Sequence, residues 1–380
     1  MIRVLIFIDW FYPGYKGGGP IKSVHSLVNN LNDEFEFYII TSDRDLGDKK
    51  QYSNVVFNTW NKYNENVYVY YISPFIPKLR AIASILYEFN PDKIYINSLF
   101  SIRFGILPLI YSRYLFEPHK IILAPRGMLH DGAISKKKWR KILYLKALLL
   151  SGISSGILFH ATDQTEHVDI IKYFKKSKTI FQIPNLSGKV DDQIKSLFKE
   201  RNQLAIIFIS RIEQKKNLSF LLKLLCDIKD LKVKMNIFGY PVENSYYREC
   251  QNLADSLPEN ITIQWNDAIS FEFVKSKLID HHLFILPTLG ENYGHAIIEA
   301  LSVGRPVLIS DQTPWKNLHE YHAGWELPLS DKQAWIKAIE EAASWDQGEF
   351  DKHCQGALEY ARAHTKVEEL VEKYREMFGG

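Results

Sequence analysis

Short apolar segments alternate with amphipathic stretches along the whole chain, and this alternation restricts the fold more than any other feature of the sequence. Segments such as 2–8 are apolar on both faces, which is typical of strands in a parallel sheet covered by helices. Between such segments, apolar residues recur at helical spacing, for example over 21–31 and 218–228. This pattern predicts βαβ units and an α/β fold. We expect strands at 2–8, 37–41, 93–97, 120–125, 157–161, 179–184, 204–210, 233–239, 261–265, 283–287 and 306–310.

The strands form two series, which are separated by a polar segment over 187–203. A length of 380 residues also suits two domains. We therefore predict two Rossmann-like, doubly wound domains over residues 1–188 and 189–365, facing a central cleft that binds a ligand at the carboxyl ends of the strands. The remaining segment, 366–380, is predicted to be a helix that either crosses back to the first domain or simply ends the chain.

The two halves of the chain also differ in the sign of their net charge. Residues 1–190 contain 25 Lys and Arg against 15 Asp and Glu, a net of +10, whereas residues 191–380 contain 22 against 29, a net of −7. The basic half therefore either faces an anionic partner or is a solvated surface.

Composition excludes several classes of protein. Hydrophobic residues make up 46% of the chain, which excludes a disordered protein. The sequence shows neither a signal peptide nor a clean membrane span. Three scattered cysteines, without metal-ligand spacing, indicate a reducing compartment. We expect a cytoplasmic protein that is either free or peripheral on the inner face of the cytoplasmic membrane.

The densest cluster of chemically active residues is the string PTLGENYGHAIIEA over 287–300. A strand ends at its first residue, a loop follows, and a helix is expected from about Gly294. If the helical turn extended back, Glu291, His295 and Glu299 would share one face. Backbone N–H groups at the start of a helix suit a phosphate, and carboxylates suit sugar hydroxyls.

This string resembles the signature of the retaining glycosyltransferases of the GT-B fold, family 4, in which two glutamates frame such a loop. The resemblance covers nearly the whole chain and is vague over 43–85. It implies that Glu291 contacts hydroxyls of the donor sugar and that Glu299 holds the nucleotide ribose. The residues between them, Asn292, Tyr293, Gly294 and His295, would complete the donor-binding set. Two glutamates at this spacing also occur on ordinary solvated helices.

A second motif, SRIEQKKN over 210–217, follows an apolar strand and opens a helix. Arg211 suits bidentate binding of a phosphate, and Lys216 supplies a mobile point charge. In a water-poor site the two cations would stabilise a leaving diphosphate without a metal. The motif resembles the Arg–Lys pair with which the family binds the donor diphosphate, although Lys215 is an alternative to Lys216. Arg211, Lys216 and Glu291 are the predicted catalytic residues.

Two motifs in the first half are predicted to contact the donor or the acceptor. Gly18 and Gly19 lie in a Gly-rich loop where the backbone can approach a ligand closely, or they simply make the loop flexible. The string PRGML over 125–129 resembles one found in the bacterial surface-polysaccharide branch of the family. Arg126 stands where other branches have a histidine that touches the donor sugar. His130 lies one turn further on, either as a ligand of sugar or acceptor or in an ordinary capped loop.

The remaining candidates concern membranes, metals and nucleic acids. The segment 136–150 combines basic and aromatic residues, which suits a membrane interface, an anionic lipid-linked acceptor or a packed helix with solvated lysines. No nucleic-acid-binding motif accompanies it. Asp43 and Asp45 could hold a divalent metal, but a turn is the simpler interpretation, and we expect no metal. His281 and His282 are expected to be structural.

The resemblance implies an enzyme of polysaccharide biosynthesis that transfers a sugar, with retention, from a nucleotide-diphosphate sugar to a carbohydrate, expected to be a lipid-linked glycan. It implies no cofactor beyond the donor substrate, for which UDP or GDP is expected as the nucleotide. The acceptor hydroxyl would attack from the front face and lose its proton to the leaving phosphate. Two alternatives remain: a sugar-nucleotide epimerase of the same fold, and a non-catalytic protein that binds nucleotide sugars.

Overall fold

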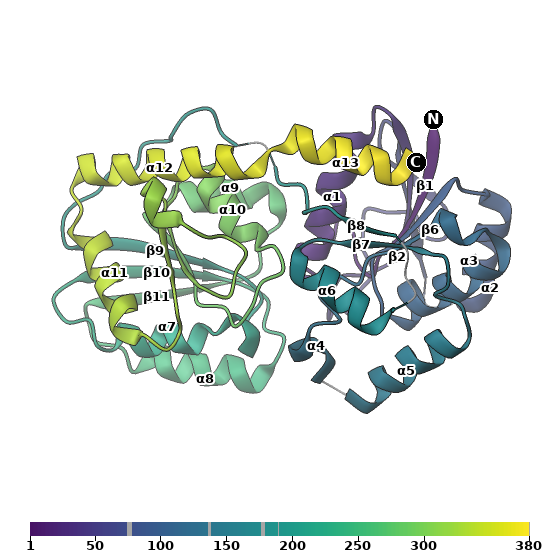
Figure 1. The fold of residues 1–380 in the computed structure, drawn as a ribbon. Coiled ribbons are helices and arrows are strands. Elements are labelled where there is room, and N and C mark those ends of the chain that lie inside the picture. The colour runs from purple at the N-terminus through teal and green to yellow at the C-terminus, as the bar shows by residue number, and fades with distance from the viewer. Residues whose placement is uncertain (74–77, 136–137, 176–178, 189, 380) are drawn as a thin grey trace. The chain divides into compact units, whose positions relative to one another are not determined.

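The chain folds into two compact units, which Figure 1 shows in a computed structural model. The structure describes residues 1–379 apart from 74–77, 136–137, 176–178 and 189. The first unit comprises Met1–Leu186 and Val367–Gly380, and the second comprises Ser187–Lys366. Each unit is built on its own, mostly parallel, sheet. The predicted α/β fold with two Rossmann-like domains is thereby confirmed.

The first sheet has eight strands among the described residues, in the order β3-β4-β2-β1-β5-β6-β7-β8. All neighbouring strands are parallel except β3 and β4, which are antiparallel at the edge. The strand β1 is central, so that Val4 lies opposite Phe37 on one side and Lys93 on the other. The strands are β1 (Ile2–Phe7), β2 (Phe35–Ser42), β3 (Trp60–Asn64), β4 (Val67–Ile72), β5 (Lys93–Ile96), β6 (Ile121–Leu123), β7 (Leu158–Ala161) and β8 (Ile180–Gln182).

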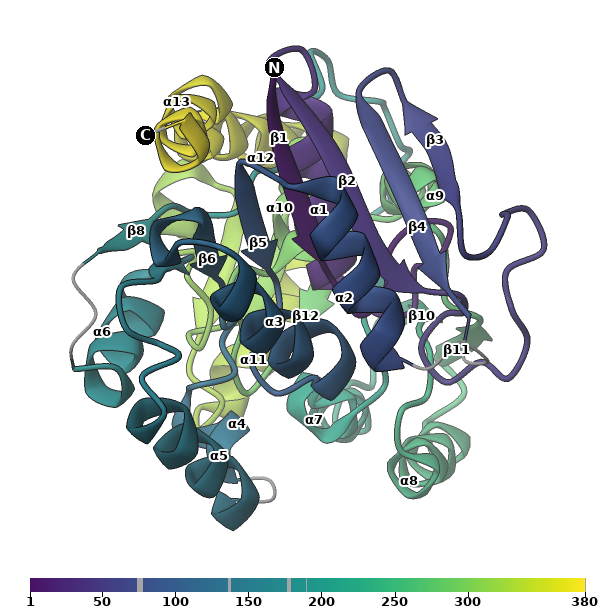
Figure 2. The ribbon, with the colours of Figure 1, turned by 90° about the vertical axis from the view of Figure 1, so that its right-hand side faces the viewer.

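Helices cover both faces of this sheet. Apolar residues of α2, α3, α4, α5 and α6 share one buried cluster with strand residues such as Leu5 and Phe7, and Figure 2 shows α2 and α3 in front of the sheet. The helices are α1 (Gly19–Leu31), α2 (Lys78–Phe89), α3 (Leu107–Leu115), α4 (Asp131–Ser135), α5 (Lys138–Leu150) and α6 (Gln164–Tyr173), with a π-helical turn η1 (Ile102–Ile106) and a 3-10 turn η2 (Pro118–Lys120).

The last helix, α13 (Val367–Gly379), belongs to the first unit although it ends the chain. Its Phe378 packs edge-to-face on Phe35 and Tyr95, with ring centroids 5.8 and 5.5 Å apart. The Tyr374 hydroxyl donates to the Pro184 carbonyl oxygen at 3.2 Å. These aromatic contacts bury the apolar face of α13 on the first sheet.

The second sheet has six strands among the described residues, in the order β11-β10-β9-β12-β13-β14, and all neighbours are parallel. Figure 1 shows α9, α10 and α12 on one face and α7 and α8 on the other. The strands are β9 (Gln203–Ile209), β10 (Lys232–Phe238), β11 (Ile261–Asn266), β12 (Leu283–Leu286), β13 (Val307–Ser310) and β14 (Gly324–Leu327). The helices are α7 (Leu218–Leu225), α8 (Asn244–Asp255), α9 (Phe271–Ile279), α10 (His295–Ser302), α11 (Lys332–Ser344) and α12 (Gln347–Thr365), with 3-10 turns η3 (Gln214–Lys216) and η4 (Leu318–Tyr321).

Every predicted strand has a counterpart in the structure within a few residues of its expected ends. The strands β3, β4 and β14 were not predicted. The first two form an aromatic-rich hairpin at the sheet edge, where Trp60 lies opposite Tyr70. The strands β3 and β14 lie at sheet edges, where they are not buried on both faces, and so they lack the continuous apolar runs that reveal the central strands. The strand β4 lies between β3 and β2, and most of its residues alternate between buried and partly buried.

Candidate active site

The second sheet changes direction between β9 and β12. The chain runs from β9 outward to β10 and β11, and from β12 outward on the other side to β13 and β14. In open α/β sheets, ligands bind beyond the carboxyl ends of the strands at such a switch point. The segments that leave β9 and β12 here are 210–217 and 287–294, which are the two motifs singled out in the sequence.

The first of these segments presents two cations. Arg211 follows β9 and pairs with Glu213, with 2.9 Å between Nη2 and Oε1. The 3-10 turn η3 then carries Lys216, whose Nζ pairs with Oε1 of Glu291 from the other segment. The side chains of Lys216 and Glu291 are only 13% and 11% exposed. The pair is therefore largely shielded from solvent, and its attraction is stronger than that of a surface ion pair.

Backbone hydrogen bonds hold the two segments together. The Lys215 carbonyl oxygen accepts from Leu289 N at 2.8 Å and from the Thr288 hydroxyl at 3.1 Å. Glu291 N donates to the Gln312 carbonyl oxygen at 2.9 Å. Lys215, the alternative cation, supplies this carbonyl, while its side chain lies beside Gly290. The ion pair to Glu291 is made by Lys216.

A glycine sets the start of the helix that follows. Gly294 has φ +77°, and a Cβ added there would lie 2.8 Å from Cδ1 of Ile297, so the position favours glycine. The helix α10 begins at His295, and Glu291 lies in the loop before it. The helical turn does not extend back, so Glu291 does not share a helical face with His295 and Glu299, which lie four residues apart on α10.

The loop between the two glutamates is anchored by a residue of the loop that follows β13. The indole N–H of Trp315 donates to the Tyr293 carbonyl oxygen at 2.5 Å, and the two rings pack with centroids 5.3 Å apart. The Tyr293 ring also packs against the His295 ring, with centroids 4.7 Å apart. Burial raises the pKa of Tyr293. Tyr293 and Glu299 are buried, whereas Asn292 and His295 are partly exposed.

The glycine loop of the first unit is held by Asp45. One oxygen of this carboxylate accepts from the backbone N–H groups of Tyr15 and Lys16, at 2.7 and 2.9 Å. The loop leads to Gly18, which has φ +70° and precedes α1 at Gly19. Asp43, by contrast, is bound by Arg44 and Gln51. No group of three or more potential metal ligands occurs among the described residues.

Arg126 is fixed by neutral acceptors. It has a left-handed backbone, with φ +55°, and its guanidinium donates to the side-chain oxygens of Asn97, Asn185 and Tyr95. The Tyr95 hydroxyl in turn lies 2.6 Å from Nδ1 of His160, whose Nε2 lies 2.8 Å from a backbone carbonyl oxygen. Burial, together with the charge of Arg126, lowers the pKa of His160 to about 3, so this imidazole is neutral.

The neutral His160 donates a hydrogen bond through Nε2 to the Ile183 carbonyl oxygen and accepts one at Nδ1 from the Tyr95 hydroxyl. Sequence reasoning missed these partners of Arg126, although the polar residues that end strands, such as Asn97, were a usable signal. Most of the Arg126 donors are thus used inside the first unit.

His130 forms a second polar pair in this unit. Its Nδ1 lies 2.6 Å from Oδ2 of Asp169 on α6, and the imidazole remains 28% exposed. A carboxylate in this position orients the ring and fixes which nitrogen faces outward. The sequence did not indicate Asp169 as its partner, because 39 residues separate the two.

Known proteins resemble this chain in sequence and in fold. A family model described as "Glycosyl transferases group 1" matches residues 189–362, which is nearly all of the second unit. An uncharacterized glycosyltransferase of Methanocaldococcus jannaschii is 24% identical over 318 residues, covering 81% of this chain and 79% of that protein.

Solved structures are similar over the full chain. Sucrose-phosphate synthase from Thermosynechococcus elongatus has a TM-score of 0.74 at 14% identity, and Anabaena Alr3699/HepE in complex with UDP and glucose has 0.73 at 14%. Both comparisons cover 100% of each chain. The structural likeness shows a GT-B fold, and the family match supports a glycosyltransferase. No helix among the described residues is long and apolar enough to cross a membrane.

Proposed function

We propose that this protein is a retaining glycosyltransferase that moves a sugar from a nucleotide-diphosphate sugar to a carbohydrate acceptor. The observation that carries the proposal is the meeting of Arg211, Lys216 and Glu291 at the switch point of the second sheet, within the unit that matches the glycosyltransferase family. At the carboxyl ends of the strands, two cations suit a diphosphate, and a carboxylate suits a sugar hydroxyl.

Each cation at this site already has a carboxylate partner that a phosphate can replace. Lys216 pairs with Glu291, and Arg211 pairs with Glu213. When the donor diphosphate binds, its oxygens take over these cations. Glu291 is then released to accept hydrogen bonds from the donor sugar. The site therefore couples diphosphate binding to recognition of the sugar.

The cations also supply the main catalytic effect. Negative charge develops on the leaving diphosphate as its bond to the sugar breaks, and preorganised donors stabilise that charge most strongly in the transition state. We propose that the acceptor hydroxyl attacks from the same face and gives its proton to the leaving phosphate. In this proposal neither glutamate acts as the nucleophile of a glycosidase, and no metal ion takes part.

A test of this function is product analysis with UDP-, GDP- and ADP-sugars. UDP is tried first, because one structural relative was solved with UDP and glucose. Proton NMR of the transferred or hydrolysed sugar, with EDTA present, should show the anomeric configuration of the donor. An inverted product would contradict retention, and a strict need for Mn²⁺ would contradict metal independence. Formation of an isomer of the donor alone would identify an epimerase.

Replacing Glu299 with alanine should weaken binding of the donor nucleotide about tenfold, because it removes a carboxylate proposed to accept hydrogen bonds from ribose hydroxyls. Titration calorimetry with the nucleotide diphosphate measures this directly. Glu340→Ala, which removes an exposed glutamate of α11, is the matched control. Equal affinity in wild type and the Glu299 variant would remove this residue from the ribose site.

We further propose that the acceptor is a lipid-linked glycan of surface polysaccharide synthesis, and that α5 holds the protein on the anionic membrane that carries it. Between Asp131 and Asp163 the sequence has six basic residues and no acidic residue. On α5, Leu145 and Leu148 are buried in the first unit. Its outer face exposes Trp139, Leu143 and Leu150, at 68%, 61% and 89%.

Three exposed apolar residues of α5, Trp139, Leu143 and Leu150, form one stripe. Positions 139, 143 and 150 are separated by four and seven residues and so lie on the same side of a helix. The exposed Lys138 and Arg140 flank this stripe, and the exposed Lys146, seven residues after Trp139, lies on the same side of the helix. An apolar stripe with basic borders is the arrangement of helices that lie in the interface of an anionic membrane.

Replacing Trp139, Leu143 and Leu150 together with serine should abolish binding to vesicles that contain phosphatidylglycerol, because it removes the apolar stripe. Co-flotation of the full chain with vesicles measures binding. The wild type should bind anionic vesicles, bind phosphatidylcholine vesicles weakly, and lose binding as salt is raised. Phe273→Ser, at another exposed apolar position on α9, should bind as wild type. Failure of the wild type to float, or equal flotation of the triple variant, would exclude this role for α5.

A further inference from the structure

The first sheet has a switch point of its own, at β1 and β5. From β1 the chain continues to β2 on one side, and β5 continues to β6 on the other. Asp9 follows β1, and Ser101 follows β5; the Ser101 hydroxyl donates to Oδ1 of Asp9 at 2.6 Å. Burial raises the pKa of Asp9, against hydrogen bonds from Ser101 and Ser98. This edge is the expected place for a ligand of the first unit.

A tight turn brings an arginine to the same edge. Ser101 caps the π-helical turn η1 by accepting from Phe104 N. Gly105 lies so close to β5 that a Cβ there would be 2.5 Å from the Ser98 carbonyl oxygen, so only glycine permits this approach. The turn therefore holds the backbone of Arg103 firmly beside the ends of β1 and β5.

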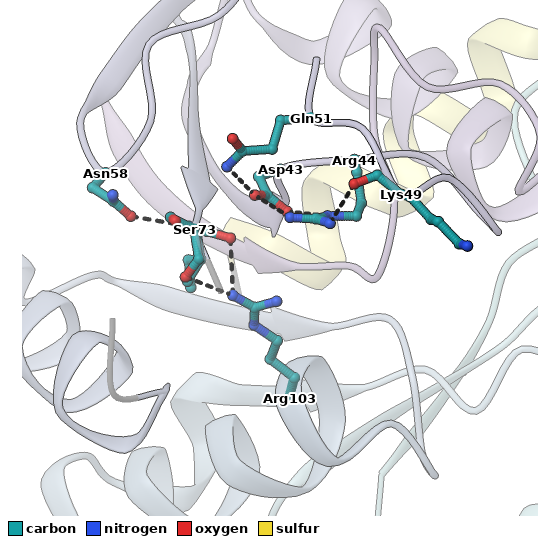
Figure 3. Close-up of polar contacts among 8 residues, drawn as sticks. Asp43, Arg44, Lys49, Gln51, Asn58, Ser73 and Arg103 are labelled. Atoms are coloured by element: carbon teal, nitrogen blue, oxygen red, sulfur yellow. Dashed lines mark hydrogen bonds and ion pairs between the residues drawn. The ribbon is translucent and has the colours of Figure 1, made fainter. Parts of the chain in front are cut away.

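Within the described part of the chain, Arg103 makes hydrogen bonds to backbone carbonyls alone. Its Nη2 donates to the carbonyl oxygens of Ile72 and Ser73, at 2.8 and 3.2 Å, which anchors one side of the guanidinium (Figure 3). Its Nε is buried without a hydrogen-bond partner. Among the described residues, no carboxylate forms an ion pair with it. A half-buried guanidinium with unused donors is the arrangement that an oxyanion satisfies.

The nearby carboxylate Asp43 is already occupied. Arg44 donates to both of its oxygens, at 2.9 and 3.0 Å, and Gln51 donates to one of them at 2.6 Å (Figure 3). Burial lowers the pKa of Arg103; the charges of Asp43 and Asp9 oppose this, and the like charge of Arg44 adds to it. An anion bound beside Arg103 would offset both the cost of burying its charge and the repulsion from Arg44.

We infer that the first unit holds an acceptor subsite in which Arg103 binds an oxyanion of the acceptor and Asp9 accepts a hydrogen bond from an acceptor hydroxyl. This inference rests on the proposed function and specifies its acceptor: a glycan with a phosphate or carboxylate group near the hydroxyl that is glycosylated. Arg103 provides selectivity through charge, since a neutral glycan leaves its donors unsatisfied.

The test compares charged and neutral probes on the full chain, with the donor site saturated by UDP or GDP. The probes are methyl β-glucuronide, glycerol 3-phosphate and neutral methyl β-glucoside, and binding is followed by ligand-observed NMR. We expect at least one charged probe to bind about tenfold or more tightly than the glucoside, since hydrogen bonds to charged groups are the stronger ones. Preference for the phosphate or for the carboxylate identifies the source of the oxyanion. Equal binding of charged and neutral probes to the wild type would overturn the inference without any variant.

Arg103→Gln should reduce the charged probe's affinity about tenfold and leave that of the glucoside unchanged. Arg103→Lys, which keeps the charge, should restore part of the affinity, whereas Arg375→Gln, which removes an exposed arginine of the same unit, should have no effect. Undiminished binding of the charged probe to Arg103→Gln would overturn the inference. Nucleotide binding is recorded in the same samples: a chain that binds nucleotide but no anionic probe keeps the proposed function, and one that binds no nucleotide loses it.

Discussion

Replacing Arg211 with alanine should lower kcat by about 10²- to 10³-fold, the usual effect of removing one preorganised donor from a developing negative charge. The side chain is 37% exposed and pairs only with Glu213 among the described residues. Its loss leaves Glu213, whose side chain is only 12% exposed, without its cation, so the free energy of unfolding should fall by about 1–2 kcal/mol while the unit stays folded. Steady-state kinetics of donor turnover, together with a urea unfolding curve, separate the two effects.

The matched control for this variant is Arg201→Ala. Arg201 is also an arginine of the second unit with a carboxylate partner, Asp346, but it lies away from the switch point and is 65% exposed. The Arg201→Ala variant should turn over the donor at the wild-type rate. Near-normal turnover in Arg211→Ala would show that Arg211 does not stabilise the leaving diphosphate.

Replacing Lys216 with methionine should lower kcat about 10²-fold or more and also destabilise the second unit by about 2 kcal/mol. The destabilisation arises because Glu291 is left in a largely buried position without its cation. Adding Glu291→Gln should restore most of the stability, because the buried charge is then gone, but none of the activity. Kinetics and unfolding of both single variants and the double variant form a double-mutant cycle.

This cycle distinguishes a catalytic pair from a structural one. If Lys216 and Glu291 served the fold alone, activity would return with stability in the double variant. A double variant that is both stable and active would therefore contradict the roles proposed for these two residues.

Most of the fold could be predicted from the sequence because the central strands are buried on both faces. Apart from Arg3 and Ser210, the runs 2–8 and 204–210 are apolar, which is the pattern of strands covered by helices on both faces. The edge strand β3 was missed because none of its residues is fully buried. The strand β4, one position further in, was missed because most of its residues alternate between buried and partly buried. The start of α10 at His295 matches the helix expected from about Gly294, whose left-handed backbone ends the loop and leaves Glu291 outside the helix.

The residues proposed to bind the donor could be identified from short sequence motifs, whereas the residues with which they form ion pairs and hydrogen bonds could not. Arg211, Lys216 and Glu291 lie in two short motifs, but the pairing of Lys216 rather than Lys215 with Glu291 depends on the hydrogen bonds of the Lys215 carbonyl. The Asp9–Ser101 contact joins residues 92 positions apart. Such contacts are set by the strand order of the sheet, which spacing along the chain does not contain.

The most direct test of the central claim is donor binding to the second-unit site in the absence of metal. Thermal unfolding of the wild type and of Arg211→Ala would be followed with UDP-, GDP- and ADP-sugars in EDTA, since a ligand that binds only the folded state raises Tm. We expect one donor to raise the Tm of the wild type in EDTA and to raise that of Arg211→Ala much less. No shift with any donor, a shift that needs Mn²⁺, or equal shifts in both proteins would contradict it.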